Sequence, residues 1–437
     1  MDLNETEYYD FQEHVFELID DYLDKNALFM YHSEFSEDLT DEIANYIYTD
    51  FQELQLCEDE TFDYDDLYDL IDDIVEDFFE IFQDEFPKRS YLCTSVNTLP
   101  DIGVISNKLE TIKNIYQPVQ RTTEWYEYRH NLITASNIWK IFKSDSQINS
   151  IIYEKCKPFD PYSNDKYNWT SGGSLQWGTM CEAVSIELYE TLFSTKIAEF
   201  GCVKHPVYEC IGASPDGINV DPTSERYGRM IEVKNIVNRE ITGIPKEEYW
   251  IQMQIQMETC DLDECDFIET RFKEYTSETE FYEDEMVEWK GIILCFTQKD
   301  TYNSKPIYKY MPIELGKEGK ERKEEVETIR NWVTNTISEF QHELILFKTY
   351  YWYLDEFSCV LVKRNKIWFQ HAVTKILDVW KTIEMEKTTG YEHRMAKKKI
   401  FAPNPHIFMA IADENSHILY NIPVKQDIGL IKLDHHI

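Results

Sequence analysis

The segment 212–235 constrains this chain more than any other, because it reads GASPDG, then a polar stretch, then MIEVKN. Side chains alternate between the two faces of a strand, so the apolar residues of MIEVKN should point to one face, and Glu232 and Lys234 to the other. The stretch between the two motifs is rich in turn-forming residues and can fold the chain back. The sequence therefore predicts two strands joined by a turn, with Asp216 beside Glu232.

Two carboxylates followed by a lysine suit the hydrolysis of a phosphodiester. Asp216 and Glu232 can hold Mg²⁺, which takes hard oxygen ligands. Lys234 can orient a water molecule or stabilise the negative charge that develops on the phosphorus oxygens. A surface hairpin with a salt bridge would show the same pattern, so this motif by itself leaves both interpretations open.

The negative charge of the chain is concentrated at its N-terminus. The net charge of −39 is unfavourable for a protein that handles nucleic acid. Residues 1–100, however, carry 30 acidic and three basic residues, whereas the rest carries 52 acidic and 40 basic residues. Nucleic-acid binding by the rest of the chain is therefore not excluded. The length of 437 residues and the apolar fraction of 43% indicate a folded protein of two or three domains.

The cysteines and the N-terminal sequence bear on the cellular compartment. The ten cysteines form no C-x-x-C pair and no regular framework, which is typical of reduced thiols and argues against a four-cysteine iron–sulfur cluster. No signal peptide opens the sequence, and no apolar run approaches the length of a transmembrane helix. We therefore expect an intracellular protein that is neither secreted nor placed in a membrane.

Residues 1–86 read as an acidic helical domain of three amphipathic helices, in which apolar residues recur at helical spacing. Three interpretations remain open: a small bundle with a solvated acidic face, a docking module for a basic partner, and a mimic of the charge of DNA. Residues 87–120 mix proline, serine, asparagine and isolated apolar residues, which is typical of a linker, here with one short helix.

The middle of the chain reads as an α/β unit. Its first part, 125–142, predicts two helices around a tight turn, with polar caps on the second helix that leave backbone N–H groups free for a phosphate near Arg129. The polar segment 143–175 suggests a loop over the site. A helix at 177–193 follows, with Glu182 on the face that should turn inward.

Strands and one more helix continue this unit. The runs 196–207 and 208–220 read as two strands that lead into the hairpin. The segment 245–260 then predicts a helix with an apolar stripe. Gln252 and Gln256 lie together on an adjoining face of this helix and can reach across the sheet.

Two further strands complete an α/β core that we place at 121–317. The remaining residues, 318–437, predict a helical C-terminal extension that ends in a β-hairpin turning at DENS. The sequence HRMAKKK at 393–399 is the most basic cluster of the chain. It is either an ordinary solvated helix end or a contact for the nucleic-acid backbone.

Five motifs follow one another along this core, and their order is more specific than any one of them. They are Trp125-x₃-Arg129-x₃-Ile133-Thr-Ala-Ser136, Trp177-Gly-x₃-Glu182, Ser214-Pro-Asp216-Gly, Glu232-Val-Lys234 and Gln252-x-Gln254. The series resembles the lambda-exonuclease type of viral recombination nuclease, the YqaJ-like branch of the PD-(D/E)XK superfamily, over roughly residues 120–300. The resemblance implies a central mixed sheet flanked by helices.

The resemblance also implies which residues carry the chemistry. The catalytic set would be Glu182, Asp216, Glu232, Lys234 and Gln252. Mg²⁺, or Mn²⁺ in its place, would be held by Asp216, Glu232, the carbonyl of Val233 and, partly through water, Glu182. The attacking water would be positioned by Lys234.

A second group of residues is implied to receive DNA. The 5′-phosphate would be bound by Arg129, Ser136, Ser214 and Gln252, with Gln254 as a further DNA contact. The predicted activity is Mg²⁺-dependent digestion of duplex DNA from its 5′ ends, which leaves 3′ single strands for recombination, repair or genome processing. The alternatives are an endonuclease or a mixed DNA and RNA nuclease of the same fold, and a non-catalytic scaffold built on the acidic domain.

The resemblance finally bears on partners. Double-stranded DNA ends are the implied substrate, and a single-strand annealing protein or another basic partner could dock on residues 1–86. The family can form rings around DNA, so a homo-oligomer is possible, although the acidic domain is outside the family pattern. If the chain is viral, the place of action would be the cytoplasm or nucleus of the host cell.

Overall fold

The structure is a computed structural model. It describes residues 4–53, 63–92, 101–161, 173–299, 305–315, 322–395, 408–412 and 418–423. It divides into two units, 1–394 and 395–437, each of which is described by itself. Among the described residues, no helix combines the length and the apolar character needed to cross a lipid bilayer.

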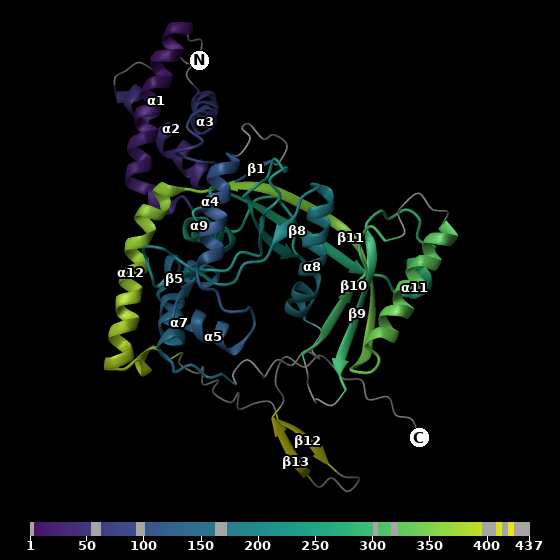
Figure 1. Ribbon diagram of the computed structural model, residues 1–437. Coiled ribbons are helices and arrows are strands. Elements are labelled where there is room, and N and C mark those ends of the chain that lie inside the picture. The colour runs from purple at the N-terminus through teal and green to yellow at the C-terminus, as the bar shows by residue number, and fades with distance from the viewer. Residues whose placement is uncertain are drawn as a thin grey trace. The chain divides into compact units, whose positions relative to one another are not determined.

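A mixed sheet forms the centre of the first unit (Figure 1), with the strand order β10-β9-β11-β8-β7-β6-β3 and with β1 paired to β11. The pair β7–β8 is parallel, and the other described pairs of this sheet are antiparallel. The predicted α/β class, a mixed central sheet flanked by helices, is confirmed. The strands are β1 (Tyr91–Leu92), β3 (Ile197–Ala198), β6 (Gly217–Asn219), β7 (Met230–Asn235), β8 (Glu264–Glu274), β9 (Lys290–Gln298), β10 (Ile307–Tyr310) and β11 (Leu344–Lys363).

The hairpin predicted around the acidic motif is β6 and β7, which pair antiparallel through Gly217 and Ile231. Alternation along β7 divides its side chains as the sequence predicts. Ile231 and Val233 pack against Tyr189 of helix α8 (Ser174–Leu192) on one face of the sheet. The opposite face is covered by helix α9 (Glu247–Cys260), toward which Glu232 points.

The runs 196–207 and 208–220, predicted as two strands, hold four short strands, the last of which is β6 of the hairpin. Gly201, Pro206 and Pro215 interrupt the runs, because proline has no N–H to donate to a ladder and glycine weakens a strand interior. Two of these strands, β3 and β6, belong to the central sheet. The other two, β4 and β5, belong to a small second sheet with the order β2-β5-β4. Its strands are β2 (Ile133–Thr134), β4 (Val203–Lys204) and β5 (Ile211–Ala213).

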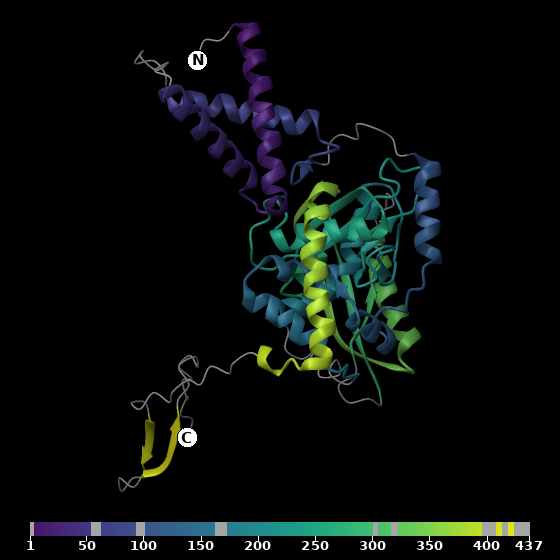
Figure 2. The same ribbon diagram turned by 90° about the vertical axis from the view of Figure 1, so that its left-hand side faces the viewer.

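The sequence predicted a loop for the segment 143–175. This prediction is wrong for part of the segment, because it contains helix α7 (Asp145–Cys156). Ile151, Ile152 and Cys156 bury one side of this helix, and α7 packs along α12 (Lys366–Thr389). Figure 2 shows α12 running along the sheet-containing part of the chain. Tertiary packing thus makes a helix from a stretch whose polar residues suggested a loop. Residues 162–172 lie outside the described part.

The C-terminal extension is not purely helical. Helix α11 (Arg322–Phe340) is followed by the 20-residue strand β11, which lies between β8 and β9 in the centre of the sheet. The sequence of β11 is rich in aromatic and β-branched residues, which favour strands. The sheet therefore continues well past residue 317, where the sequence placed the end of the core.

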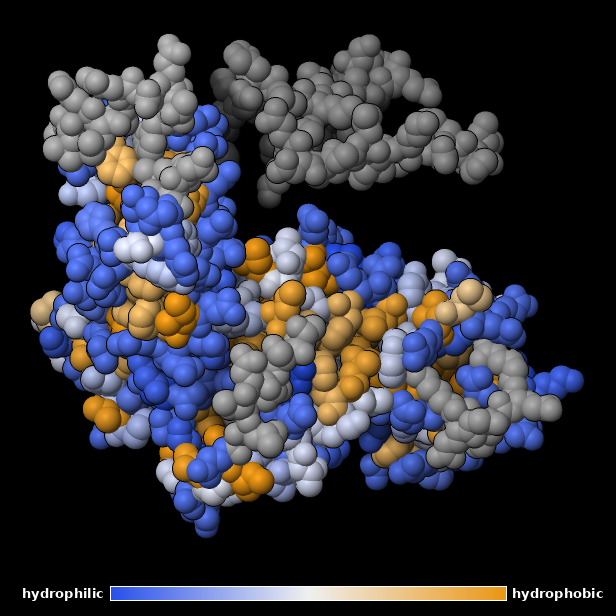
Figure 3. All heavy atoms as spheres, turned by 90° about the horizontal axis from the view of Figure 1, so that it is seen from above, coloured by the Kyte–Doolittle hydropathy of each residue, from blue (hydrophilic) through white to orange (hydrophobic). Residues whose placement is uncertain are grey.

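The three acidic helices predicted at the N-terminus correspond to α1 (Glu5–Asn26), α2 (Phe35–Glu53) and α3 (Tyr64–Ile81). The short helix expected in the following linker is α4 (Ile102–Asn114). On the face seen in Figure 3, hydrophilic residues cover most of the described surface, with apolar patches between them.

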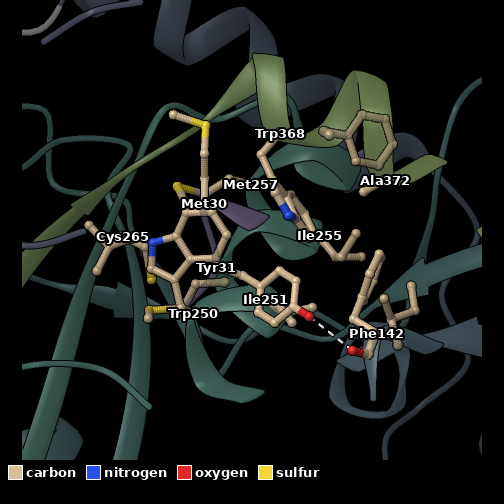
Figure 4. Packing of buried hydrophobic residues seen from close by; sticks show 14 of the residues in the cluster. Met30, Tyr31, Phe142, Trp250, Ile251, Ile255, Met257, Cys265, Trp368 and Ala372 are labelled. Carbon is tan, nitrogen blue, oxygen red and sulfur yellow. Dashed lines mark hydrogen bonds between the residues drawn. The ribbon is translucent and has the colours of Figure 1, made fainter. Parts of the chain in front are cut away.

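The N-terminal helices are anchored in the apolar core at one point. Met30 and Tyr31, which follow the 3₁₀ turn after α1, pack among Phe142, Trp250 and Trp368 (Figure 4). The Tyr31 hydroxyl donates a hydrogen bond to the Phe142 carbonyl at 2.9 Å. This contact joins residues more than a hundred positions apart.

The start of the predicted linker is also held in place. Arg89 donates hydrogen bonds to the Pro245 carbonyl, and β1 pairs with β11. Residues 88–92 are therefore part of the folded core rather than a free connection.

In the second unit, β12 (Phe408–Ala412) and β13 (Ile418–Pro423) form the predicted antiparallel hairpin. The turn residues of DENS lie outside the described residues. So do most residues of the basic cluster 393–399, of which Arg394, in the first unit, pairs with Glu386 of α12. The structure assigns no nucleic-acid contact to that cluster.

Candidate active site

The three ionisable groups of the hairpin lie together. Asp216 immediately precedes β6, and its Oδ2 accepts a hydrogen bond from the Val233 N–H of β7 at 2.8 Å. Lys234, two residues after Glu232 on the same face of β7, pairs with its carboxylate through Oε1. The geometry predicted from strand alternation is therefore present in the structure.

Glu232 is completely buried, and donors surround its carboxylate. Gln252 Nε2 donates to Oε1 at 2.8 Å, and Gln256 Nε2 donates to Oε2 at 2.8 Å. The two glutamines are four residues apart on α9 and so share one face of the helix. Together with the Lys234 ammonium, they satisfy a charge that would otherwise be costly to bury.

The surroundings raise the pKa values of both Asp216 and Lys234, for different reasons. Burial, and next the Glu232 charge, raise the pKa of Asp216 well above its usual value. Burial would lower the pKa of Lys234, but the Glu232 and Asp216 carboxylates hold it above its usual value. When both carboxylates are ionised, they exceed the single ammonium in charge, and a further cation would relieve this excess negative charge.

Helix α8 adds a third carboxylate. Burial raises the pKa of Glu182, and the Arg121 guanidinium, 3.8 Å from its Oε2, opposes that shift. The helix is fixed on β7 by Asn235, whose Oδ1 accepts from Ser185 at 2.9 Å and whose Nδ2 donates to the Gly178 carbonyl at 3.0 Å. This network fixes the part of α8 that carries Glu182 beside the hairpin.

A second group gathers around Arg129 at the end of α5 (Thr123–His130). Its guanidinium donates to Ser214 Oγ at 2.9 Å and to Ser136 Oγ at 3.2 Å, and lies 4.4 Å from the centre of the Trp125 ring. Burial lowers the pKa of Arg129. Among the described residues, Arg129 forms no ion pair with a carboxylate.

Both groups border one cavity of about 990 Å³. Glu182, Asp216 and Gln252 line its acidic side, and Arg129, Ser136 and Ser214 line the other. Residues that the sequence places far apart are therefore brought to one concave site, as ligand-binding residues generally are.

The helix start predicted to bind phosphate differs from the expectation. Helix α6 (Ala135–Ile138) has only four residues, and its N-cap residue Thr134 makes no capping hydrogen bond. The chain continues as a short 3₁₀ helix at Trp139–Phe142. A helix this short contributes little dipole, so the Arg129 guanidinium and the two serine hydroxyls are the donors that could meet an anion here.

Gln254, predicted as a DNA contact, does not face the cavity, and this expectation is wrong. Its side chain is 1% exposed. Its Nε2 donates to the Lys363 carbonyl at 3.0 Å, and its Oε1 accepts from the Asn365 N–H at 2.6 Å. It thus fastens α9 to the end of β11. Gln256, which is not part of the motif Gln252-x-Gln254, instead contacts Glu232.

Lys155 on α7 is a residue that the sequence did not single out. It is 3% exposed, and its Nζ donates to the Arg129 carbonyl at 3.0 Å. Burial lowers the pKa of Lys155 to about 8, although Glu154 opposes the shift. The lysine was missed because its segment read as a loop, where a lysine would be solvated.

The donors at the site fit a hard divalent cation. Glu182, Asp216, Glu232 and the Val233 carbonyl offer only oxygen ligands, the type that Mg²⁺ and Mn²⁺ take. Within the described ranges, however, no three His, Cys, Asp or Glu side chains are grouped closely enough to form a ready-made metal site. Both oxygens of Glu232 already accept hydrogen bonds, so a metal would compete with these donors for that ligand.

Comparisons with known proteins agree with the motif order. Residues 124–263 match the profile of the YqaJ-like viral recombinase domain. The chain is also 27% identical over 311 residues to the uncharacterised protein R354 of Acanthamoeba polyphaga mimivirus. That match covers 63% of this chain and 54% of the viral protein, so the chain spans about half the length of this relative.

Two solved structures of an alkaline exonuclease, LHK-Exo from Laribacter hongkongensis, also align with the chain. The first has a TM-score of 0.35 and 16% identity, and a complex with dAMP has a TM-score of 0.34 and 17% identity. Each alignment covers 61% of this chain and 94% of the other. At TM-scores this low, neither likeness adds to the site geometry given above. The family profile and the ordered motifs nevertheless agree, since residues 124–263 are similar to the YqaJ-like viral recombinase domain.

Proposed function

We propose that the chain is a Mg²⁺-dependent deoxyribonuclease that degrades duplex DNA from 5′ ends and leaves 3′ single strands. The observation that carries this proposal is that one cavity is lined both by Glu182 and Asp216, of the acidic group, and by the separate group of Arg129, Ser136 and Ser214. The first group suits cleavage of a phosphodiester, and the second suits a terminal phosphate. The YqaJ-like domain supports the association with recombination.

Each group would have a distinct task. Arg129 would bind the 5′-phosphate through charge-assisted hydrogen bonds, with Ser136 and Ser214 as hydroxyl donors. Lys234, held by Glu232, would orient the attacking water and stabilise charge on the phosphorus oxygens. Bound Mg²⁺ would supply Lewis-acid activation of that water and of the phosphate. Gln252 and Gln256 donate hydrogen bonds to the Glu232 carboxylate and hold it in place.

The proposed preference for 5′-phosphorylated ends follows from the surroundings of the Arg129 guanidinium. Its guanidinium is half-buried, borders the cavity and donates hydrogen bonds to the neutral hydroxyls of Ser136 and Ser214. A cation in that situation is stabilised by an arriving anion. A terminal phosphate, which carries more charge than an internal one, gains most from it. This argument favours an exonuclease over an endonuclease of the same fold.

Arg129→Ala is expected to reduce the preference for 5′-phosphorylated over 5′-hydroxyl duplex ends by about tenfold or more, because a charge-assisted hydrogen bond is lost. Initial cleavage rates on the two substrates, with identical sequences, measure this preference. Lys113→Ala serves as the matched control, since Lys113 lines the same cavity without contacting either serine. Equal losses on both substrates would contradict a pocket for the terminal phosphate.

Binding of 5′-phosphorylated ends is expected to weaken as the pH rises from about 7 to 9.5. The pKa of Lys155 is about 8 in the folded protein, against its usual value of 10.5, so its ammonium loses its proton within this range. A bound phosphate favours the protonated form. If it raises that pKa by one unit, affinity falls by about tenfold across the titration. Lys155→Met should flatten the pH profile of binding; an unaltered profile in this variant would show that Lys155 is not the group whose titration weakens binding.

The acidic N-terminal helices have a separate place in the proposal. Their apolar residues, such as Leu67 and Ile71 of α3, are buried, while acids such as Asp66 and Asp69 are exposed. This surface suits a basic protein, for example a single-strand annealing protein that would receive the 3′ strand. The proposed site of action is intracellular.

A further inference from the structure

One wall of the cavity is built by residues that precede the family match at 124–263. The segment 113–121 contributes Lys113 and Arg121 to the lining, among others. Gln117 and Gln120 fasten this segment to the chain opposite. The Gln117 side chain accepts from the Gly201 N–H at 2.6 Å, and Gln120 Nε2 donates to the Phe200 carbonyl at 2.8 Å. The wall is thus attached at defined points.

Arg121 has an unusual backbone conformation within this wall. Its φ is +65°, in the left-handed region that favours glycine. A turn that only had to lead into α5 would be better served by glycine or asparagine. Non-glycine residues held in such conformations are concentrated at functional sites, where the side chain rather than the backbone justifies the strain.

The side chain of Arg121 is placed to meet a ligand. It is 58% exposed and borders the cavity, with its guanidinium 3.8 Å from Glu182 Oε2. An ion pair this long and this exposed contributes little stability. A phosphate offers the same guanidinium a bidentate, charge-assisted contact, and can replace the carboxylate as its partner.

The two cavity arginines have different neighbours. Arg129 contacts Ser136 and Ser214, whereas Arg121 lies beside Glu182, one of the acids. We propose that Arg121 binds the phosphate of the bond to be cut, while Arg129 binds the terminal phosphate. This inference rests on the proposed nuclease function, and it assigns a substrate contact to a residue outside the family match.

The test uses Arg121→Gly, because glycine keeps the left-handed backbone and removes only the side chain. The melting temperature should rise or stay constant, since strain is relieved. Affinity for a short duplex without metal should fall by about tenfold, and the slope of log affinity against log salt should decrease by about one, as expected for one lost phosphate contact. The fall should be equal for 5′-phosphorylated and 5′-hydroxyl ends. Arg121→Lys should restore part of the affinity.

Ser194→Gly is the matched control. Ser194 has a φ of +47° but does not line the cavity, so its replacement should relieve the same kind of strain with no effect on DNA binding. If Arg121→Gly binds DNA with the affinity and salt slope of the unaltered protein, the inference is wrong, although the nuclease proposal stands. If the unaltered protein neither binds nor cuts DNA, the nuclease proposal fails and the inference fails with it.

Discussion

Asp216→Asn is expected to reduce Mg²⁺-dependent cleavage of duplex DNA by about a hundredfold or more, while it stabilises the metal-free protein. The loss of activity follows because an amide is a poor ligand for a divalent cation and removes charge that the reaction needs. The gain in stability follows because Asp216 and Glu232 are two carboxylates in one confined site. Removing one of them relieves their repulsion.

Two measurements check this result together. Cleavage of linear duplex DNA gives the activity, and thermal unfolding with and without Mg²⁺ gives the stability and the metal response. Mg²⁺ should raise the melting temperature of the unaltered protein but not that of the variant. Glu199→Gln is a suitable control, because Glu199 lines the same cavity outside the group of acids on the hairpin. Full activity in Asp216→Asn would remove Asp216 from the site.

Lys234→Met is expected to lower the cleavage rate by about a hundredfold, because charge on the phosphorus oxygens is no longer stabilised. The same change leaves the buried Glu232 carboxylate without its ammonium partner. Breaking a buried pair in this way costs about 3 kcal/mol or more of unfolding free energy. The single variant therefore confounds lost chemistry with lost stability.

The double variant Glu232→Gln with Lys234→Met separates the two effects. It carries no unpaired charge, so its unfolding free energy should recover toward that of the unaltered protein while cleavage stays absent. Chemical denaturation and a cleavage assay on the same preparations give both quantities. Recovery of activity together with stability would mean that Lys234 has only a structural role.

Local sequence patterns predicted the centre of the site. Alternation along MIEVKN placed Glu232 and Lys234 on one face of β7, and the turn formers before it returned the chain so that Asp216 meets that strand. Helical spacing placed Gln252 and Gln256 on one face of α9. The motif Gln252-x-Gln254 selected Gln254 instead, although residues two positions apart on a helix point in different directions.

Features that depend on distant contacts were not predictable from the sequence in the same way. Strand β11 is stabilised by pairing with β8 and β9, whose sequences begin dozens of residues earlier. Helix α7 owes its buried side to α12. Lys155 gains its contact with Arg129 only once α7 has packed. Local propensity carries no information about such partners.

In the acidic N-terminal region, too, the local elements were predictable from the sequence and the distant contacts were not. Composition and spacing predicted its helices, but they gave no sign that Met30 and Tyr31 insert between α9 and α12 (Figure 4). These two residues carry no charge and lie between helices rather than on one. Truncation at residue 86 would therefore remove part of the apolar core. Charge-neutralising changes on the exposed faces of α1–α3 would test the docking surface with less damage.

The central claim is that acids and a lysine beside an anion pocket cut DNA from its 5′ end. The most direct measurement is digestion of a 5′-phosphorylated linear duplex, its 5′-hydroxyl counterpart and a closed circular plasmid, side by side in Mg²⁺, with strand-specific labels. We predict that the phosphorylated duplex loses its 5′ strands fastest and leaves 3′ single strands, while the circle stays intact. Cleavage of the circle at a comparable rate, or no cleavage of any substrate, would contradict the account.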